Sequence, residues 1–392
     1  MAQPTPLEQL YKTATQPRSI SIGMPAATLT ADHRFPLTPE GAERLVERGF
    51  RVLMEEGAAM PIHYSDEAYA RRGVSICRRA QALQADVVIS LSRLAASDVA
   101  MMRRGSMLLG FLYAEPGDAR TLRTLLDRGI TAIALENICD PTGLRPFADI
   151  IQEVAGRAAI SLASSLLADA IHGKGILLGG IPGVVPCEVM VIGSDMAAIA
   201  AAGTAIGLGA TVRIFDNDVY ALRRALHVLG PGAIGSAIHP KVFEGALRSA
   251  DIVVAAHSLS PDGIVDASLA DGMKRGVICF DLTMHPGCAF PSLRLVDLNE
   301  AMPGDNPMGG PVRCCYINAG NAVPRTLAMA LSNTFVSMLD EILVCDGTAN
   351  ALRLNSALRK GVYAFLGRCV NEQAAAILGI RAVDIDLLIQ YC

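Results

Sequence analysis

The 392-residue sequence contains no tryptophan, and only 5% of its residues are aromatic. No stretch reaches the roughly 18 uninterrupted apolar residues of a membrane span, so no span is expected. The first residues lack a basic region followed by an apolar run, so no secretory signal is expected and the protein is expected in the cytoplasm. The net charge of −4 gives no reason to expect nucleic acid or an acidic membrane as a partner.

Disulfide and zinc signatures are also missing. The ten cysteines are scattered along the chain, none forms a C-x-x-C motif, and Cys314 and Cys315 are adjacent. Without an export signal, this pattern predicts free and mostly buried thiols in a reducing compartment.

The length and the order of the elements predict an α/β fold of two Rossmann-like domains with a cleft between them. A single core stops growing at about 250–300 residues, so 392 residues favour two domains. In the first part of the chain, strands alternate with helices, which is typical of a parallel sheet. We expect these strands at residues 19–24, 50–54, 85–91, 106–112 and 131–135.

Residues 187–216 form the central motif of the chain. An apolar run ending at Ile192 predicts a buried parallel strand, and Gly193 ends it. An alanine-rich helix follows and is closed by glycines, and a second strand ends at Asp216. Strand, glycine turn, helix and a terminal acid together predict a dinucleotide-binding unit, and Asp216 favours NAD over NADP because it would repel a 2′-phosphate.

The glycine turn of this unit departs from the G-x-G-x-x-G/A fingerprint. It reads Gly193-Ser194-Asp195-Met-Ala-Ala198, so the first glycine and the third small residue are present. Asp195 stands where the middle glycine would let the backbone approach the pyrophosphate. Its Cβ and its negative charge would both oppose two phosphates, so NAD binding is predicted with a weakened turn.

The second half of the chain continues the alternation. We expect a loop over residues 282–303 and two long helices, 151–171 and 324–343, that bridge or pack the domains. The small residues of the first of these helices would let another backbone approach closely. The predicted domains are 1–150 with 324–392, which binds substrate, and 151–323, which binds the dinucleotide.

Several motifs spread over the chain resemble the alanine dehydrogenase / transhydrogenase α-subunit family. They are Arg34-Phe-Pro-Leu-Thr-Pro-Glu-Gly, Glu153-Val-Ala-Gly-Arg157, Gly179-Gly-Ile-Pro-Gly-Val-Val-Pro186 and Val323-Pro-Arg-Thr326. The resemblance implies a discontinuous substrate domain around a Rossmann domain, with catalysis in the cleft. It also implies NAD-linked oxidative deamination of a small amino acid to a 2-oxo acid, usually in a homo-oligomer.

The resemblance further assigns roles to positions. The family's carboxylate-binding arginine maps to Arg34, for which a surface arginine on a turn is the alternative. The family's substrate lysine falls on Ser92 and its acid/base histidine on Tyr113. Its catalytic aspartate falls on His285, and Asn318 keeps the asparagine near the cofactor. Because three positions differ in type, the substrate is predicted to be other than plain alanine.

Two histidines follow predicted strands of the second domain. Ligands of open parallel sheets bind outside the carboxyl ends of the strands, so His257 and His285 could both face the cleft. We predict His285 as general acid/base and His257 near the cofactor, with loop histidines as the alternative. A metal pair completed by Asp281 or Cys288 is a further alternative, although the spacing matches no known zinc signature, and no metal is predicted.

Three functions follow from these observations. The first is an NAD-linked oxidoreductase acting on a small amino or imino acid, with a small amino or oxo acid as its partner molecule. The second is a repurposed or inactive paralogue that serves as a small-molecule-binding or assembly module, which Ser92, Tyr113 and Asp195 favour. The third is a cyclodeaminase-like lyase that holds and recycles NAD.

Overall fold

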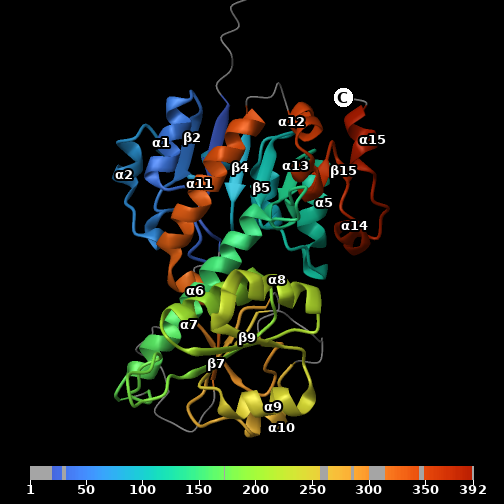
Figure 1. The fold of residues 1–392 in the computed structure, drawn as a ribbon. Coiled ribbons are helices and arrows are strands. Elements are labelled where there is room, and N and C mark those ends of the chain that lie inside the picture. The colour runs from blue at the N-terminus through green and yellow to red at the C-terminus, as the bar shows by residue number, and fades with distance from the viewer. Residues whose placement is uncertain are drawn as a thin grey trace, which may run out of the picture.

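The computed structural model describes residues 20–28, 32–171, 173–256, 264–283, 287–299, 314–343 and 348–390. Their strands form two sheets, drawn one above the other in Figure 1, and the long helix α6 (Pro146–Ala168) runs between them. Helices flank both sheets. The predicted α/β class with two Rossmann-like units is therefore confirmed.

The first sheet has eight strands in the order β15-β14-β6-β5-β4-β1-β2-β3. Strands β1 to β6 are parallel, whereas β14 pairs antiparallel with β6 and β15. The C-terminal part of the chain thus completes a sheet that the N-terminal strands begin. The strands are β1 Ser21–Met24, β2 Arg51–Glu55, β3 Ser75–Cys77, β4 Val87–Ser90, β5 Met107–Gly110, β6 Thr131–Ala134, β14 Val362–Phe365 and β15 Arg368–Cys369.

Helices from both ends of the chain cover this sheet, and α11 in particular packs on α1 and α6. Thr38 caps α1 by accepting a hydrogen bond from the Gly41 N–H, as its position before a proline predicts. The helices are α1 Pro39–Glu47, α2 Asp66–Ala70, α3 Arg79–Leu83, α4 Ala96–Met101, α5 Ala119–Asp127, α11 Pro324–Leu343, α12 Thr348–Leu354, α13 Ser356–Gly361, α14 Glu372–Leu378 and α15 Ile385–Gln390. Short 3-10 turns are η1 Met60–Ile62, η2 Pro116–Asp118 and η3 Leu135–Asn137.

The second sheet has seven parallel strands in the order β12-β13-β11-β10-β7-β8-β9. The strands are β7 Glu188–Ile192, β8 Thr211–Phe215, β9 Ala233–Ser236, β10 Ile252–Ala255, β11 Ile278–Asp281, β12 Arg294–Asp297 and β13 Cys314–Ile317. Its helices and turns are α7 Met196–Gly207, α8 Val219–Leu229, α9 Pro240–Ser249, α10 Ala267–Asp271, η4 Gly230–Gly232 and η5 Ala319–Ala322. The predicted β7–α7–β8 unit is present.

Helix α6 joins the two halves through a close contact with α7. A Cβ atom on Gly156 would lie only 2.3 Å from the carbonyl oxygen of Ala197, so α6 and α7 touch along their backbones. Among the described residues, α6 is also the one helix long and apolar enough to cross a membrane. Its packing between two sheets gives an alternative reason for that composition, because a core helix is apolar as well.

Five short elements were missing from the sequence prediction. Strand β3 and helix α3 are too brief to show a periodicity, and β12 lies where we expected only a loop. β12 is an edge strand with exposed residues, so its sequence lacks a buried apolar run. The β14–β15 hairpin depends on pairing with β6, more than 200 residues earlier, and helix α6 begins at Pro146, before the predicted start at residue 151.

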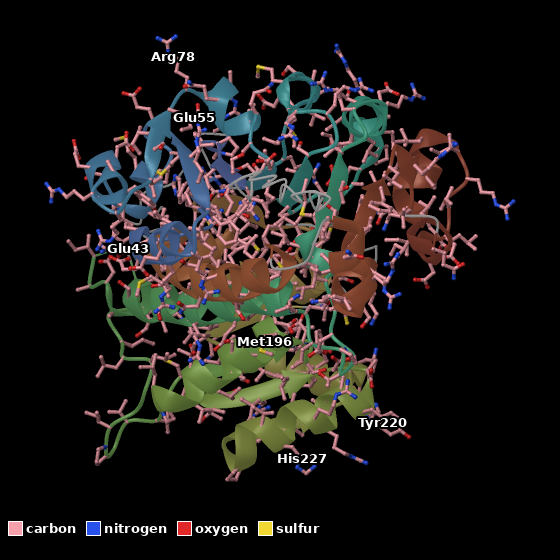
Figure 2. All side chains as sticks on the ribbon, turned by 90° about the horizontal axis from the view of Figure 1, so that it is seen from above. Glu43, Glu55, Arg78, Met196, Tyr220 and His227 are labelled. Atoms are coloured by element: carbon pink, nitrogen blue, oxygen red, sulfur yellow. The ribbon has the colours of Figure 1, made fainter. Side chains whose placement is uncertain are left out.

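Both sheets reverse their strand order at one point. The first does so between β1 and β4, and the second between β7 and β10. Loops that leave the carboxyl ends of the strands at such points form binding sites in open parallel sheets. In Figure 2, the side chains of Tyr220 and His227 of α8 point outward.

Candidate active site

Asp32, Arg34 and Ser92 form a hydrogen-bonded unit beside the reversal point of the first sheet. Nε and Nη2 of Arg34 each donate to one oxygen of Asp32 at 2.8 Å, and Ser92 Oγ donates to Asp32 Oδ2 at 2.6 Å. Burial would raise the pKa of Asp32, but the hydrogen bonds and charge of Arg34 and the Ser92 hydroxyl together lower it. Asp32 is thus held as a carboxylate that fixes the orientation of Arg34.

Asp32 occupies only one edge of the Arg34 guanidinium. A guanidinium carries five N–H groups, and Nη1 of Arg34 donates to no residue that the structure describes. The Arg34 side chain is 23% exposed, and its Cζ lies 5.6 Å from the centre of the Phe111 ring. The end of the guanidinium formed by Nη1 and Nη2 is therefore left for a planar anion such as a carboxylate.

Tyr113 lies next to this unit, in the loop that follows β5. Its ring stacks on Phe111 with an interplanar angle of 11° and a centroid distance of 5.7 Å. Its φ of 36° lies in the left-handed region, which is unusual for a bulky side chain. Burial and then the nearby Glu136 raise the pKa of Tyr113 to about 12. At neutral pH Tyr113 is therefore a hydrogen-bond donor and not a base.

Glu136 follows β6 and is only 8% exposed. Its Oε1 accepts hydrogen bonds from the backbone N–H groups of Leu112 at 3.1 Å and Tyr113 at 2.6 Å. Burial raises the pKa of Glu136, although these backbone donors oppose that effect. The carboxyl group therefore ties the ends of β5 and β6 together beside the candidate site.

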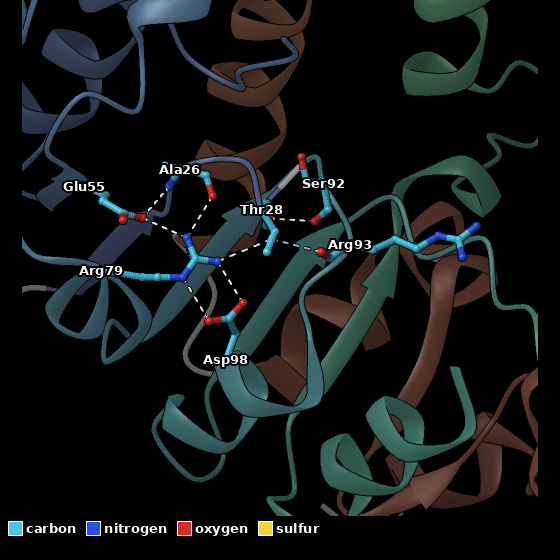
Figure 3. A network of polar contacts seen from close by, with 8 residues as sticks. Ala26, Thr28, Glu55, Arg79, Ser92, Arg93 and Asp98 are labelled. Atoms are coloured by element: carbon cyan, nitrogen blue, oxygen red, sulfur yellow. Dashed lines mark hydrogen bonds and ion pairs between the residues drawn. The ribbon is translucent and has the colours of Figure 1, made fainter. Parts of the chain in front are cut away.

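A second ion cluster fixes the loop after β1. In Figure 3, Arg79 lies between Glu55 and Asp98, under the loop that carries Ala26 and Thr28. Its Nε and Nη2 contact the two oxygens of Asp98 at 2.9 and 2.8 Å, while Nη1 donates to Glu55 at 3.0 Å and to the Ala26 carbonyl at 2.9 Å. The cluster therefore holds the segment at Ala26, which precedes Asp32 and Arg34 in the chain.

The glycine turn of the second sheet holds the predicted cofactor residues. Gly193 adopts a φ of 107°, which a residue with a side chain rarely adopts, and its N–H donates to the Phe215 carbonyl at 2.8 Å. Asp195 is the N-cap of α7 and accepts a hydrogen bond from the Ala198 N–H at 3.0 Å. The aspartate thus takes one of the helix N–H groups with which such a turn binds phosphate.

Asp216 stands at the tip of β8, as predicted. Its Oδ2 accepts a hydrogen bond from Ser194 Oγ at 2.5 Å, and its Oδ1 accepts one from the Asp218 N–H at 2.8 Å. Ser194 and Asp216 are both buried, with 7% and 6% of their surfaces exposed. The two predicted residues are brought together, and each carboxylate oxygen keeps a lone pair for a further donor.

The Gly193 turn and Asp216 fit a dinucleotide, although the charge of Asp195 opposes its binding. The Gly193 turn and Asp216 have the arrangement that holds a diphosphate and a ribose hydroxyl. The N–H groups of Met196 and Ala197 have no partner among the described residues, so the start of α7 still offers donors. Asp195 places a carboxylate at the same helix end, which opposes a diphosphate by charge.

The remaining predicted residues divide into two groups. His257, predicted near the cofactor, and His285, predicted as the acid/base, lie outside the described residues. Asn318 follows β13 with a φ of 61°, and its Nδ2 donates to Asp297 at 2.9 Å, so its side chain joins β12 to β13.

Asp281, considered above as a metal ligand, is 1% exposed and serves the backbone instead. Its carboxylate accepts hydrogen bonds from the N–H groups of Thr283, Gly287 and Ala289. Among the described residues, no group of histidine, cysteine and acidic side chains could hold a metal ion. Asp281 therefore fixes both ends of the loop after β11.

Sequence reasoning missed Asp32, Glu136 and Arg79. Glu136 follows the predicted strand ending at Leu135, so the rule used for His257 and His285 would have selected it. Asp32 stands two residues before Arg34, where its charge could have suggested a partner. Arg79 gave no signal, because its helix was not predicted.

Comparisons with known proteins agree on one family over nearly the whole chain. Residues 23–151 match Alanine dehydrogenase/PNT, N-terminal domain, and residues 159–372 match Alanine dehydrogenase/PNT, C-terminal domain. An alanine dehydrogenase of Mycobacterium tuberculosis is 31% identical over 373 residues, covering 92% of this chain and 97% of the relative. One of Bacillus subtilis is 31% identical over 376 residues, covering 94% of this chain and 97% of the relative.

Solved structures give the same result. An L-alanine dehydrogenase superposes with a TM-score of 0.77 at 25% identity, covering 92% of this chain and 99% of that chain. A transhydrogenase from Sinorhizobium meliloti shares the fold, with a TM-score of 0.73 at 19% identity over 90% of this chain and 100% of that chain. The predicted resemblance is confirmed, and the chain belongs to the alanine dehydrogenase/PNT family.

Proposed function

We propose that the protein is an NAD-linked oxidoreductase that interconverts a small amino or imino acid and its 2-oxo acid. The observation that carries the proposal is the free end of the Arg34 guanidinium, held in place by Asp32 and next to Tyr113. A fixed guanidinium edge suits the carboxylate that both forms of such a substrate share. Family membership supports the reaction type.

The residues of the first sheet would bind and orient the substrate. Arg34 would hold its carboxylate, and Asp32 would keep Arg34 from rotating. Tyr113, protonated at neutral pH because its pKa is raised to about 12, would donate a hydrogen bond to the carbonyl or imine. His285 stays the sequence-based candidate for moving the proton, and a His285→Ala variant of unchanged activity would remove it from the mechanism.

The residues of the second sheet would hold NAD. Gly193 and the start of α7 would face the diphosphate, and Asp216 would accept hydrogen bonds from the adenosine ribose. When bound, NAD would supply the hydride acceptor for oxidation of the amino acid. The negative charge of Asp195 is expected to weaken this binding without preventing it.

The substrate is proposed to differ from plain alanine. Ser92 gives its hydrogen bond to Asp32 and carries no charge, so it adds no second cation to the ion pair of Arg34 with Asp32. Tyr113 is larger than the histidine that the family resemblance implies, and it fills space beside Phe111. A substrate whose side chain stacks on or contacts an aromatic ring fits this surface better than a methyl group does.

A substrate panel tests the proposal. NADH oxidation would be followed with ammonium and 2-oxo acids whose side chains increase in size. Arg34→Lys keeps the charge but loses the planar fork, and we expect kcat/KM for the oxo acid to fall about tenfold to hundredfold, as loss of a hydrogen bond to a charged group implies. Arg93→Lys is the control, since Arg93 pairs with Glu115 and Asp118. An Arg34→Lys enzyme with unchanged kinetics would refute the carboxylate clamp.

A small-molecule-binding or assembly module without catalysis is the second candidate. The N-cap role of Asp195 supports it, because a carboxylate at the phosphate-binding helix end serves the fold and not a cofactor. Failure to bind NAD, NADH or NADPH would favour this candidate. Assembly into a homo-oligomer stays a prediction in both cases.

A further inference from the structure

Glu136 makes a contact pattern that the proposed mechanism does not use. Both of its carboxylate oxygens face the backbone of the next loop: Oε1 and Oε2 lie 3.1 and 3.2 Å from the Leu112 nitrogen. The Tyr113 N–H donates to Oε1 at 2.6 Å, the shortest of these contacts. Hydrogen bonds from backbone N–H groups to a buried carboxylate are charge-assisted and strong.

The residue held by these bonds has a strained backbone. A tyrosine with a φ of 36° is disfavoured, because its Cβ crowds the neighbouring carbonyl. Such conformations persist where the surroundings impose them, and they gather at functional sites. Here the Glu136 carboxyl group holds the N–H of Tyr113, while Phe111 holds its ring by stacking. Backbone and ring are thus fixed by different neighbours.

The C-terminal part of the chain supports the same loop. Gln373 Nε2 donates to the carbonyl of Ala114, the residue after Tyr113, at 3.0 Å. Tyr363 of β14 is 3% exposed, and burial together with Glu136 raises its pKa, so the phenol lies close to that carboxyl group. Strand β14 pairs with β6, which carries Glu136 at its end. We call the hydrogen bonds from Leu112 and Tyr113 to Glu136 the Glu136 clamp. The C-terminal part of the chain therefore packs beside this clamp, on the side of β6 opposite β5.

We propose that Glu136 is the positioning residue for Tyr113: it imposes the left-handed backbone that places the phenol beside Arg34. The role of that phenol rests on the proposed function, whereas the clamp itself is a property of the fold. Glu136 acts through Tyr113 and does not itself contact the free edge of Arg34. Loss of the carboxylate would let residues 112–114 relax toward an extended conformation and turn the phenol away from the guanidinium.

Two readouts that need no activity test this inference. In Glu136→Gln the amide group places an N–H₂ near the Leu112 N–H, so the loop can keep only part of the clamp. Exchange of the backbone amide hydrogens of residues 111–114 should become about tenfold faster or more. A tenfold change corresponds to about 1.4 kcal/mol in the free energy of local opening. The matched control is Glu115→Gln, which removes a carboxylate of the same loop with an exposed side chain and should leave exchange at Leu112 and Tyr113 unchanged.

The second readout is the titration of the Tyr113 phenol. The chain has eight tyrosines and no tryptophan, so ultraviolet difference spectra against Tyr113→Phe isolate one phenol with little interference. Glu136→Gln removes a negative charge, so the midpoint assigned to Tyr113 should move to lower pH, while Glu115→Gln should move it less. Glu136→Asp keeps the negative charge but shortens the side chain. It should therefore speed hydrogen exchange at residues 111–114, while the Tyr113 titration midpoint changes less than in Glu136→Gln.

The outcomes separate this inference from the proposed function. Unchanged exchange and an unchanged Tyr113 midpoint in Glu136→Gln would overturn the positioning role, even in an active enzyme. If Glu136→Gln does not fold, the Glu136→Asp variant tests the inference instead. Hydrogen exchange at residues 112–114 of Glu136→Asp that is as slow as in the unsubstituted protein would overturn it. Failure of NADH to bind, with both readouts as expected, would refute the proposed function and leave the clamp standing.

Discussion

Ser92 donates its hydroxyl hydrogen to Asp32 at 2.6 Å, although the two residues are 60 positions apart in the chain. The bond joins the loop after β4 to the loop after β1, on both sides of the point where the strand order reverses. It also explains how a serine can stand where the family resemblance implies a lysine. A positive charge near Asp32 is already supplied by Arg34, so a neutral donor completes the carboxylate's hydrogen bonds.

Ser92→Ala tests that relationship through its dependence on pH. The pKa of Asp32 is lowered in the folded protein, so its contribution to stability is present above the ordinary value of 3.8 and is lost as the pH falls through the folded-state value. We expect Ser92→Ala to lower the free energy of unfolding by about 1.5–3 kcal/mol at neutral pH. Urea unfolding measures this difference, which should shrink on acidification.

The control for that measurement is Ser161→Ala, which removes an exposed hydroxyl that donates to the Arg157 carbonyl. We expect this variant to change stability by less than about 0.5 kcal/mol at any pH. A Ser92→Ala protein as stable as Ser161→Ala would mean that the Asp32 bond contributes nothing.

Asp195 can be tested by separating its charge from its cap. Asparagine caps helices about as well as aspartate, so Asp195→Asn should keep the stability of α7 while removing the charge that opposes a diphosphate. Asp195→Gly also removes the Cβ atom, but glycine retains most of the preference for this position, so only a few tenths of a kcal/mol are expected to be lost.

The measurement is the affinity for NADH of each variant. We expect the dissociation constant to fall in the order unsubstituted protein, Asp195→Asn, Asp195→Gly, because charge and then bulk are removed. Asp218→Asn serves as the control, since Asp218 caps α8. An NADH affinity that both Asp195 variants leave unchanged would contradict the assigned place of the diphosphate.

The raised pKa of Tyr113 predicts that the protein loses stability at alkaline pH. Its folded-state pKa is raised from 10.0 to about 12, so its contribution is fully present below 10.0 and is lost as the pH rises toward about 12. The unsubstituted protein should therefore lose stability across this interval, and Tyr113→Phe should lose less. Thermal unfolding at several alkaline pH values measures the difference. Parallel curves for the two proteins would show that Tyr113 titrates normally.

The close contact between α6 and α7 at Gly156 predicts that a larger residue there lowers the stability of the protein. In Gly156→Ala the new Cβ would lie 2.3 Å from the Ala197 carbonyl oxygen and 2.9 Å from the Ala201 nitrogen, so α6 must move away from α7. We expect a loss of about 1–3 kcal/mol in the free energy of unfolding. Gly245→Ala in α9 is the control, because nothing lies within 4 Å of its added Cβ and a gain of about 0.5–1 kcal/mol is expected. Equal effects at both glycines would contradict the close contact.

The sequence predicts some of these features well for physical reasons. The βαβ unit of residues 188–216 has local signals throughout: a β-branched run, a glycine turn, an alanine-rich helix and a terminal acid. Helix α11 matches its predicted range of residues 324–343 because a proline starts it and a 3.6-residue apolar period runs through it. Arg34 could be found because it stands in a recognisable motif.

Other features depend on contacts that no local pattern carries. The β14–β15 hairpin joins the first sheet only because β6 offers an open edge, and the Glu136 bonds to residues 112 and 113 cross between two strands. The hydrogen bond from Ser92 to Asp32 forms because β1 and β4 are neighbours in the sheet. The cap made by Asp195 was foreseeable, since aspartate before a helix is a common N-cap, but its place in a phosphate-binding fingerprint drew the interpretation toward repulsion alone.

Titration of the purified protein with NADH tests the central claim most directly. The cofactor's own fluorescence reports binding, and the absence of tryptophan leaves little protein signal to interfere. The account predicts saturable binding that tightens in Asp195→Asn and weakens in Asp216→Ala, because these residues oppose the diphosphate and hold the ribose. No saturable binding of NADH up to millimolar concentration, in the unsubstituted protein and in Asp195→Asn alike, would contradict it.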